Sequence, residues 1–268
     1  VCKKGGSNKM GYLQGFFPIV SKQKIAEGIF DVVVACPEMA QLAKAGQFVH
    51  IRCPGVTLRR PISICQADKL WGNLRLVFEV KGEGTKNLAA LNVGDNVDIM
   101  GPLGNGFDLS GHCQHALLVG GGIGVPPLVE VATSLGKRAT AVIGFRDQSR
   151  VILEKDFRNQ GCDVRVCTDD GSYGKKGFVT QEVLAVLAQG GIDIIYACGP
   201  MVMLKALAEI AKEFGIRCQV SLEERMGCGV GACLVCACKT RDKQGQENYS
   251  HVCKNGPVFE AEEVVFGG

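Results

Sequence analysis

The chain has 268 residues, of which 46% are hydrophobic and 21% are charged, and its formal net charge is +3. This size allows two ordinary domains or three small ones, each with a buried core. The small net charge argues against nucleic acid or a membrane surface as a partner, and no apolar run is long enough to span a bilayer.

The N-terminal segment lacks the apolar stretch of a secretory signal, and Met10 is a candidate natural start. We expect residues 1–14 to form an N-terminal extension and the protein to be cytoplasmic. Fourteen cysteines are present, and nine are scattered, several within apolar strand-like runs. We interpret those nine as small hydrophobic residues of a protein from a reducing compartment.

Residues 15–108 have the rhythm of a small antiparallel β-barrel. Short β-branched runs, such as "IFDVVVAC" at 29–36 and "NLRLVFEV" at 73–80, alternate with turn residues at close spacing. Further runs of this kind are "GQFVHIRC", "PISICQ" and "DNVDIMG".

Two stretches of this zone could bind a flavin. In "LRRPISICQ", Arg60 could pair with a pyrophosphate and Ser63 could reach a ring nitrogen. Further on, a strand ends in a glycine-rich turn, residues 82–85, whose amides suit phosphate. The alternative is that the arginines are solvated charges at a strand edge and that residues 82–85 form an ordinary turn.

Residues 109–222 change to alternating strands and helices, which predicts a parallel sheet with helices on both faces. The expected strands are 115–121, 139–145, 163–168, 193–200 and 218–224, and the expected helices are 125–137, 180–190 and 200–215.

Two strand-to-helix turns of this zone, "VGGGIGVPPL" at 119–128 and "ACGPMVML" at 197–204, are candidates for binding a nicotinamide dinucleotide. The first, "VGGGIGVPPL", departs from the full G-x-G-x-x-G fingerprint because Pro127 takes the place of the third glycine. Asp147 lies roughly where an adenosine-ribose carboxylate would be, although a solvated loop acid fits as well, and Arg146 leaves NADP open. The two turns supply the candidate residues Gly121, Gly122, Gly124, Cys198, Gly199 and Pro200.

The last zone, 223–268, is rich in cysteine and glycine and too small to bury much core, so we expect a ligand to hold it. Cys228, Cys233 and Cys236 have the spacing C-x4-C-x2-C, and Cys253 follows after sixteen residues. This is the plant-type [2Fe–2S] pattern, in which intervening glycines let backbone amides approach the sulfur atoms.

Other thiol chemistries remain alternatives. Structural zinc prefers paired C-x2-C motifs, a disulfide framework conflicts with a reducing compartment, and a thioredoxin-like pair would open a helix after a strand. Cys238 is left out of the ligand set, as a strand thiol two residues after Cys236.

With these motifs assembled, the chain closely resembles the electron-transfer subunits of class 1B dihydroorotate dehydrogenases, within the ferredoxin reductase-like superfamily. The resemblance covers about residues 15–265 and is most specific at "EERMGCGVGACLVC" (223–236), together with "RRPISI" (59–64) and "GEGTKNL" (82–88).

The resemblance implies an FAD-binding barrel (15–108), an NAD-binding α/β domain (109–222) and a C-terminal [2Fe–2S] module (223–268). It implies that the cluster ligands are Cys228, Cys233, Cys236 and Cys253. It implies that FAD contacts Arg60, Pro61, Ile62, Ser63, Val77, Phe78, Glu79, Gly84 and Thr85.

The implied function is a relay that accepts electrons from a separate FMN-containing catalytic subunit oxidising dihydroorotate and delivers them to NAD⁺, in pyrimidine biosynthesis. The implied assembly is a heterotetramer with two copies of each subunit. Hydride transfer needs positioning more than acid–base help, so no residue is expected to be catalytic, and we interpret the four histidines as structural or exposed. A reductase subunit of another ferredoxin:NAD(P) or hydrogenase complex, or a zinc-bound scaffold, is the alternative.

Overall fold

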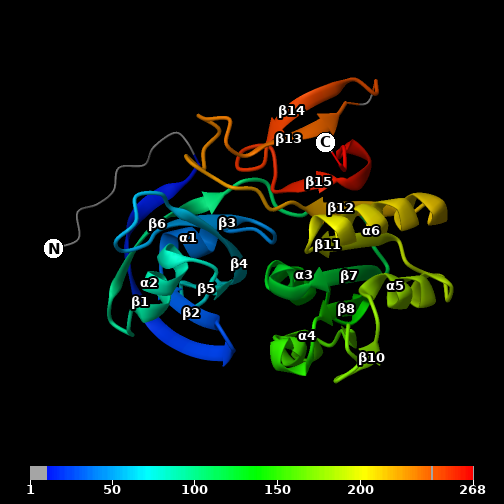
Figure 1. The fold of residues 1–268 in the computed structure, drawn as a ribbon, viewed down its shortest axis with the longest axis horizontal. Helices are drawn as coiled ribbons and strands as arrows, with labels where there is room; N and C mark the ends of the chain where they lie inside the picture. The colour runs from blue at the N-terminus through cyan, green and yellow to red at the C-terminus, as the bar shows by residue number, and fades with distance from the viewer. Residues whose placement is uncertain (1–10, 243, 268) are drawn as a thin grey trace.

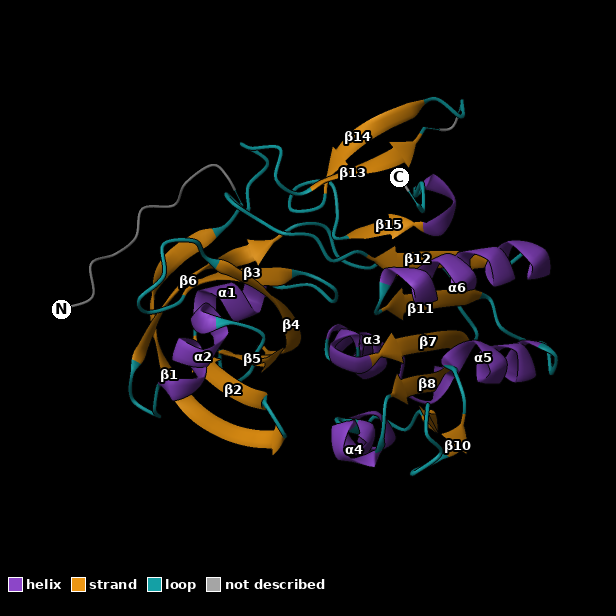
Figure 2. Ribbon diagram, viewed as in Figure 1, coloured by secondary structure: helices purple, strands orange, loops and turns teal. Residues whose placement is uncertain are grey.

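The computed structural model describes residues 11–242 and 244–267, so the expectations for residues 1–10 lie outside the described residues. A closed barrel lies beside a sheet that is flanked by helices, and a hairpin with its preceding loop lies above both (Figures 1 and 2). Among the described residues, no helix is long and apolar enough to cross a membrane.

The barrel consists of six antiparallel strands in the closed order β1-β2-β5-β4-β3-β6. Two short helices, α1 (Pro37–Leu42) and α2 (Glu83–Ala90), belong to its connections. Apolar side chains that alternate along the strands fill the interior, as a barrel with one solvated face requires. The strands are β1 (Leu13–Ala26), β2 (Ile29–Ala35), β3 (Phe48–Arg52), β4 (Arg60–Asp68), β5 (Asn73–Glu79) and β6 (Asn96–Leu103).

The second body is a seven-stranded sheet in the order β10-β9-β8-β7-β11-β12-β15, parallel from β10 to β12. All six residues of the central strand β7 are buried, because helices cover both faces of the sheet. The strands are β7 (Ala116–Gly121), β8 (Ala139–Phe145), β9 (Asp163–Thr168), β10 (Lys175–Lys176), β11 (Ile194–Cys198) and β12 (Arg217–Ser221).

The helices of this body divide into two pairs. The core cluster on one face contains α3 and α4, and that on the other face contains α5 and α6. Short 3-10 turns follow several of the strands. The helices are α3 (Pro127–Leu135), α4 (Glu154–Asn159), α5 (Val179–Leu187) and α6 (Met201–Phe214), and the 3-10 turns are Gly122–Gly124, Gly136–Arg138, Gln148–Arg150 and Ala261–Glu263.

The C-terminal segment is built into the sheet instead of standing apart. Strands β13 (Ala237–Arg241) and β14 (Glu247–His251) form a hairpin, and β15 (Val258–Glu260) pairs antiparallel with β12. Met226, Val252 and Phe259 are buried in the same cluster as α5 and α6. The expectation of little core therefore holds only for the segment in isolation, since it shares the core of its neighbour.

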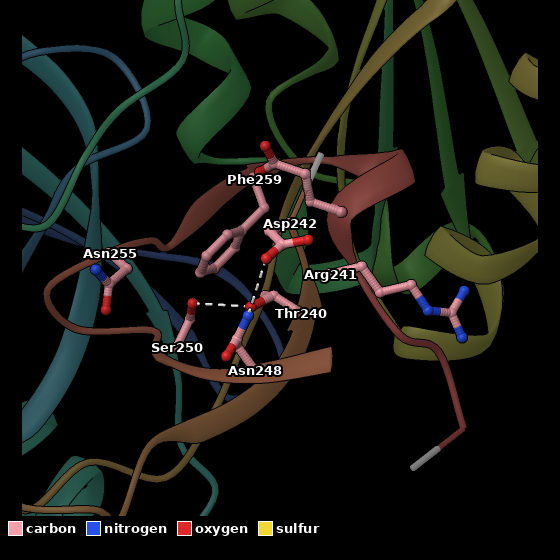
Figure 3. Close-up of a pocket in the computed structure, with 8 residues that line it drawn as sticks. Thr240, Arg241, Asp242, Asn248, Ser250, Asn255 and Phe259 are labelled. Carbon is pink, nitrogen blue, oxygen red and sulfur yellow. Dashed lines mark hydrogen bonds between the residues drawn. The ribbon is translucent and has the colours of Figure 1, made fainter. Parts of the chain in front are cut away.

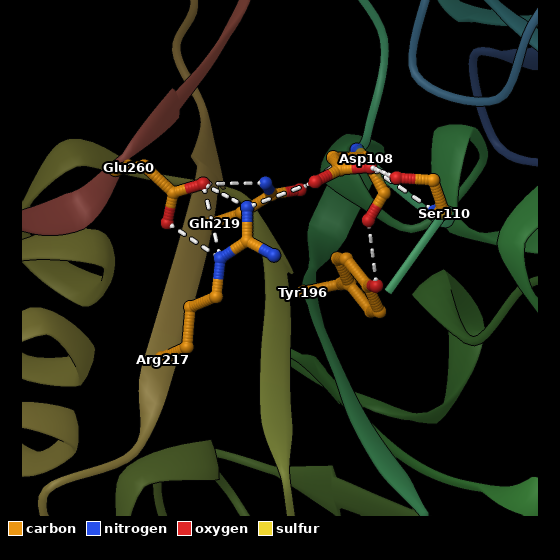
Figure 4. Close-up of polar contacts among 6 residues, drawn as sticks. All are labelled: Asp108, Ser110, Tyr196, Arg217, Gln219 and Glu260. Carbon is orange, nitrogen blue, oxygen red and sulfur yellow. Dashed lines mark hydrogen bonds and ion pairs between the residues drawn. The ribbon is translucent and has the colours of Figure 1, made fainter. Parts of the chain in front are cut away.

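A polar network joins the linker after the barrel to the sheet and to β15 (Figure 4). Arg217 on β12 forms ion pairs with Asp108 of the linker and with Glu260 of β15. Gln219 donates from Nε2 to Glu260 and accepts the amide N–H of Asp108, and the hydroxyl of Tyr196 donates to the Asp108 carbonyl. The three parts of the chain are thus tied at one point.

The fold agrees with the class predicted from the sequence: an antiparallel barrel, a parallel-sheet α/β domain and a small cysteine-rich module. The prediction did not include the antiparallel strand β15. The domain boundaries derived from the sequence remain predictions.

Candidate cofactor-binding site

We call the segment between β12 and β13, residues 222–236, the cysteine loop. Its backbone N–H groups surround the sulfur atoms of the predicted ligands. The amides of Val230 and Ala232 donate to Cys228 Sγ at 3.4 and 3.2 Å, and the amide of Gly231 donates to Cys253 Sγ at 3.1 Å. Such donors stabilise negative charge on sulfur, which a thiolate-held cluster carries.

The four predicted ligands form two pairs. The thiols of Cys228 and Cys233 lie 3.4 Å apart, close to the separation of about 3.8 Å that two sulfurs adopt on one tetrahedral metal with bonds near 2.3 Å. The thiol of Cys253 pairs with that of Cys236.

Within residues 11–242 and 244–267, no three Cys, His, Asp or Glu side chains converge on a single metal position. Two cysteines at each of two irons fit this arrangement better than four cysteines around one zinc. The residues present therefore fit a [2Fe–2S] cluster.

The environment favours ionisation at one pair. Burial acts to raise the pKa of Cys228, but the amide of Val230 and the thiol and amide of Cys233 outweigh it and lower the pKa to about 6. At Cys253, burial together with the neighbouring Cys236 thiol raises the pKa to about 12. At neutral pH Cys228 is thus a readier metal ligand than Cys253.

Two glycines of the loop have left-handed backbones, at Gly229 (φ +75°) and Gly231 (φ +78°). A Cβ on Gly229 would lie 2.6 Å from Nδ1 of His50, and one on Gly231 would lie 2.6 Å from Cδ of Lys254. Glycine is required here because of both the conformation and the close approach.

Cys238 lies on β13, opposite Ser250 of β14. Burial raises the pKa of its thiol to about 11, in contrast to Cys228. Its exclusion from the ligand set stays a prediction.

The predicted flavin residues of β4 alternate between two faces. Ile62 is buried in the barrel core, so it could contact a flavin only through its backbone. Pro61 and Ser63 are partly exposed on the outer face, where a flavin ring could bind, and Arg60 at the first position of the strand is also partly exposed.

Arg60 lies against the N-terminal turn of α2. A Cβ on Gly84 would be 3.1 Å from Nε of Arg60, so only glycine leaves the guanidinium this close to the helix. A guanidinium beside a helix N-terminus is a suitable site for a pyrophosphate, and the residues present fit FAD in this respect.

Thr85 has a local structural role in this turn. Its hydroxyl accepts the amides of Lys81 and Gly82 at 3.0 and 3.2 Å and donates to the Gly82 carbonyl. The hydroxyl is thereby occupied, so a contact of Thr85 with phosphate would come from its backbone amide.

The predicted segment of β5 uses both faces of the strand. Phe78 points into the barrel, where its ring lies 6.0 Å from that of Phe30. Val77 is buried in the core cluster that also contains α3 and α4, and Glu79 accepts a hydrogen bond from Arg150 of the α/β body at 2.9 Å. This strand therefore lies where the two bodies meet.

The predicted dinucleotide turns follow β7 and β11, which are neighbours in the sheet. They also pack tightly on each other: a Cβ on Gly124 would lie 2.4 Å from the Cys198 carbonyl oxygen, and one on Gly121 would lie 2.9 Å from Cδ of Pro200. These glycines have a packing role whether or not a dinucleotide binds, and the assignment of all six turn residues stays a prediction.

The carboxylate of Asp147 accepts the amide N–H of Ser149 at 2.8 Å and caps the 3-10 turn that follows β8. Arg146 beside it is exposed. The capping contact supports the simpler structural reading of Asp147.

A separate polar cavity of about 310 Å³ lies between the hairpin and β15 (Figure 3). Thr240 and Ser250 share a hydrogen bond of 2.9 Å within it. None of the eight residues that line it is a predicted site residue.

Sequence reasoning missed one residue of this region, His50 on β3. Its side chain is fully buried and touches the cysteine loop. Burial, with the nearby charge of Arg59, lowers its pKa to about 4. The only signal in the sequence is a polar residue between Val49 and Ile51 in a strand that pairs with the flavin strand.

Three features define an iron–sulfur flavoprotein reductase: a barrel with an arginine at a helix N-terminus, an α/β sheet with two paired glycine turns, and four thiols, of which three lie on one loop. Two family models match the chain: "Oxidoreductase FAD-binding domain" over residues 17–107 and "Iron-sulfur cluster binding domain of dihydroorotate dehydrogenase B" over residues 223–265.

Among curated relatives, the "Dihydroorotate dehydrogenase B (NAD(+)), electron transfer subunit" of Bacillus cereus (strain B4264) is 44% identical, over 92% of this chain and 96% of its own length. The subunit of the same name from Bacillus anthracis (strain A0248) is 43% identical over the same shares. The chain therefore belongs to the family of dihydroorotate dehydrogenase B electron transfer subunits.

Among solved structures, that of an NADH-dependent reduced ferredoxin-NADP oxidoreductase superposes with a TM-score of 0.84 at 34% identity, over 94% of this chain and 90% of that one. The reductase GcoB of an Amycolatopsis cytochrome P450 system has a TM-score of 0.65 at 22% identity, over 80% and 69%. The second likeness shows the fold alone.

Proposed function

We propose that this chain carries electrons from an FMN-containing dihydroorotate dehydrogenase catalytic subunit through a [2Fe–2S] cluster and FAD to NAD⁺, in the biosynthesis of UMP. The observation that carries the proposal is the contact between the cysteine loop and the flavin barrel, where Gly229 packs on His50 of β3, next to the flavin strand β4. A cluster held on one side of this contact and a flavin on the other would be placed to exchange electrons.

Nicotinamide exchanges two electrons as a hydride and an iron–sulfur cluster exchanges one, so the flavin, which can do both, must lie between them. This order agrees with the fold: the barrel contacts the cysteine loop through β3 and the α/β body through β5.

The chain's own residues bind and orient the carriers. Cys228 and Cys233 would hold one iron, and Cys236 and Cys253 the other. Arg60 with the first turn of α2 would hold the FAD pyrophosphate, and the outer face of β4 would support the ring. The turns after β7 and β11 would receive NAD⁺ at the carboxyl edge of the sheet.

We also propose that the domains span residues 15–108, 109–222 and 223–268. We propose a heterotetramer with two catalytic subunits, and a cytoplasmic location. All thirteen cysteines in the described part of the chain are free thiols, which supports a reducing compartment.

The test is electron transfer by the purified chain with and without its catalytic partner. Alone, the chain should oxidise NADH with an artificial acceptor and leave dihydroorotate unchanged. With the catalytic subunit, it should reduce NAD⁺ at the expense of dihydroorotate. Turnover of dihydroorotate by the chain alone would contradict the assignment.

Two cysteine-to-serine variants test which cysteines bind the cluster. Cys236→Ser should lose iron and at least about 100-fold in dihydroorotate-dependent NAD⁺ reduction, because removing a ligand abolishes the one-electron carrier. Cys238→Ser is the matched control and should keep both. Equal loss of iron in the two variants would show that the ligand set is wrong.

A second candidate is a reductase subunit of a ferredoxin:NAD(P) complex, favoured by the 34% identity and TM-score of 0.84 to the ferredoxin-NADP oxidoreductase structure. It would accept electrons from reduced ferredoxin without the catalytic subunit, so the same assay with reduced ferredoxin distinguishes the two.

A further inference from the structure

His50 lies on the outer face of the barrel wall, where it is completely buried. Along β3, Val49 and Ile51 point into the barrel core, so Phe48 and His50 point outward. The exposed fraction of His50 is 0%, which is unusual for a titratable side chain. Something on the outside of the barrel must cover it.

The cover is the cysteine loop. A Cβ on Gly229 would lie 2.6 Å from Nδ1 of His50 and 3.3 Å from Cγ and Cε1, so the backbone of Gly229 rests on the imidazole ring. Gly229 directly follows Cys228, the first predicted ligand. The position of the ring therefore sets how closely that ligand approaches the barrel.

The same residue is joined to the flavin strand. His50 pairs with Pro61 across the β3–β4 ladder, which places it beside Arg60 and Ile62 of the predicted FAD motif. Its carbonyl accepts a hydrogen bond from Nη1 of Arg59 at 3.1 Å. His50 is thus in contact with both predicted cofactor sites.

Neither ring nitrogen has a hydrogen-bond partner of acceptable geometry in the described residues. The backbone of Arg59 and that of Cys228 nonetheless lie close enough to act on the ring as acceptors. A buried polar group without a partner is costly, and a neutral imidazole has one N–H to donate. A small adjustment toward Cys228 would satisfy it.

We propose that His50 is a positioning residue for electron transfer, whose Nδ1–H donates to the backbone carbonyl of Cys228 and holds the cluster loop against the flavin strand. The inference rests on the proposed function, since it concerns the passage of electrons between the flavin and the cluster. His50 touches the loop backbone and need not touch either cofactor.

The experiment compares three variants of the holoenzyme. His50→Phe keeps a ring of similar size without a donor. His50→Asn places an amide N–H near the position of Nδ1, and His50→Gln places one near Nε2. His112→Phe, at an exposed histidine, is the control. The readouts are iron and FAD content, the electron paramagnetic resonance spectrum of the reduced cluster, and the single-turnover rate of cluster reduction by NADH.

We expect His50→Phe to retain FAD and iron, to change the resonance spectrum, and to slow cluster reduction about tenfold through a misplaced loop. His50→Asn should restore the spectrum and most of the rate, whereas His50→Gln should behave like His50→Phe. If His50→Phe does not assemble, the difference between the Asn and Gln variants decides.

An unchanged spectrum and rate in His50→Phe, or equal behaviour of the Asn and Gln variants, would overturn the proposal. A wild-type chain in which NADH reduces no cluster would instead refute the proposed function itself. The two failures are therefore distinguishable.

Discussion

At the scale of single residues, the cysteines divide into two populations with opposite surroundings. Two of the predicted cluster ligands, Cys228 and Cys253, receive backbone N–H donors. The scattered ones are buried among apolar side chains: Cys36 and Cys65 have exposed fractions of 0%. The same side chain is thus suited to bind a metal where backbone amides stabilise its thiolate, and behaves as a small hydrophobic residue where apolar side chains bury it.

The buried thiols make a prediction about alkaline pH. Burial raises the pKa of Cys36 from its ordinary value near 9 to about 12. Between these values the unfolded chain has lost the proton and the folded chain retains it. Stability is therefore full below pH 9 and falls as the pH rises toward 12. Cys36→Ala should reduce the slope of unfolding free energy against pH by about 1.4 kcal/mol per unit in this window.

The measurement is urea denaturation at half-unit steps from pH 8 upward. Val34→Ala, at a buried position of β2, is the control, because it should lower stability at every pH without altering the slope. An identical slope in the wild-type chain and Cys36→Ala would contradict the raised pKa.

At the scale of elements, β15 is the means by which the cysteine module is held. It adds an antiparallel strand to the edge of the sheet at β12, and Arg217 pairs with Glu260 across that edge. An edge strand has hydrogen bonds on one side only, so side-chain contacts contribute an unusual share of its stability.

Arg217→Gln should loosen β15. Since the Arg217 side chain is 43% exposed, solvent screening limits the loss to about 1 kcal/mol or less. Hydrogen exchange of the β15 amides should be up to about fivefold faster, as measured by mass spectrometry.

Arg241→Gln provides the comparison, because Arg241 pairs with Glu247 on the hairpin with both side chains 50% exposed. It should leave β15 unchanged. Faster exchange of β15 in both variants would indicate that the effect is one of net charge and not of the pairing.

At the scale of the whole molecule, an ion-pair cluster joins the barrel to the α/β body near the flavin strand. Arg75 of β5 pairs with Asp31 of β2 at 2.7 Å and with Asp156 of α4. The three side chains are 12 to 25% exposed. The contact between the two bodies therefore depends on charges that are largely removed from water.

Arg75→Gln should destabilise the protein by about 2 kcal/mol, since it leaves two half-buried carboxylates without their partner. It should also weaken FAD retention, because the flavin would lie between the two bodies. Urea denaturation and FAD fluorescence in the filtrate measure the two effects.

The matched variant is Arg158→Gln, which breaks an ion pair within α4 whose arginine side chain is 53% exposed. It should cost less than about 0.5 kcal/mol and release no FAD. Equal effects of the two substitutions would show that the Arg75 cluster does not hold the bodies together.

Much of the fold follows from local patterns in the sequence. All five strands predicted for the α/β body exist, because buried parallel strands are continuous apolar runs that can be recognised alone. The short helices α1, α2 and α4, of six to eight residues, were not anticipated, since they depend on tertiary packing more than on an apolar period. The long strand β1 was missed because half of its residues are exposed and the apolar residues in its sequence do not alternate regularly.

The sequence alone determined the chemistry: which cysteines stand at cluster spacing, where glycines allow a backbone to approach a phosphate, and which zones are barrel-like or α/β. These are properties of residues close together in the chain, so local spacing suffices to specify them. Only the tertiary structure decided that β15 joins the sheet, that Arg75 links two bodies, and that His50 lies between the flavin strand and the cysteine loop. Those contacts join residues from about 40 to about 180 positions apart, and the energy of burying them depends on the whole packed molecule.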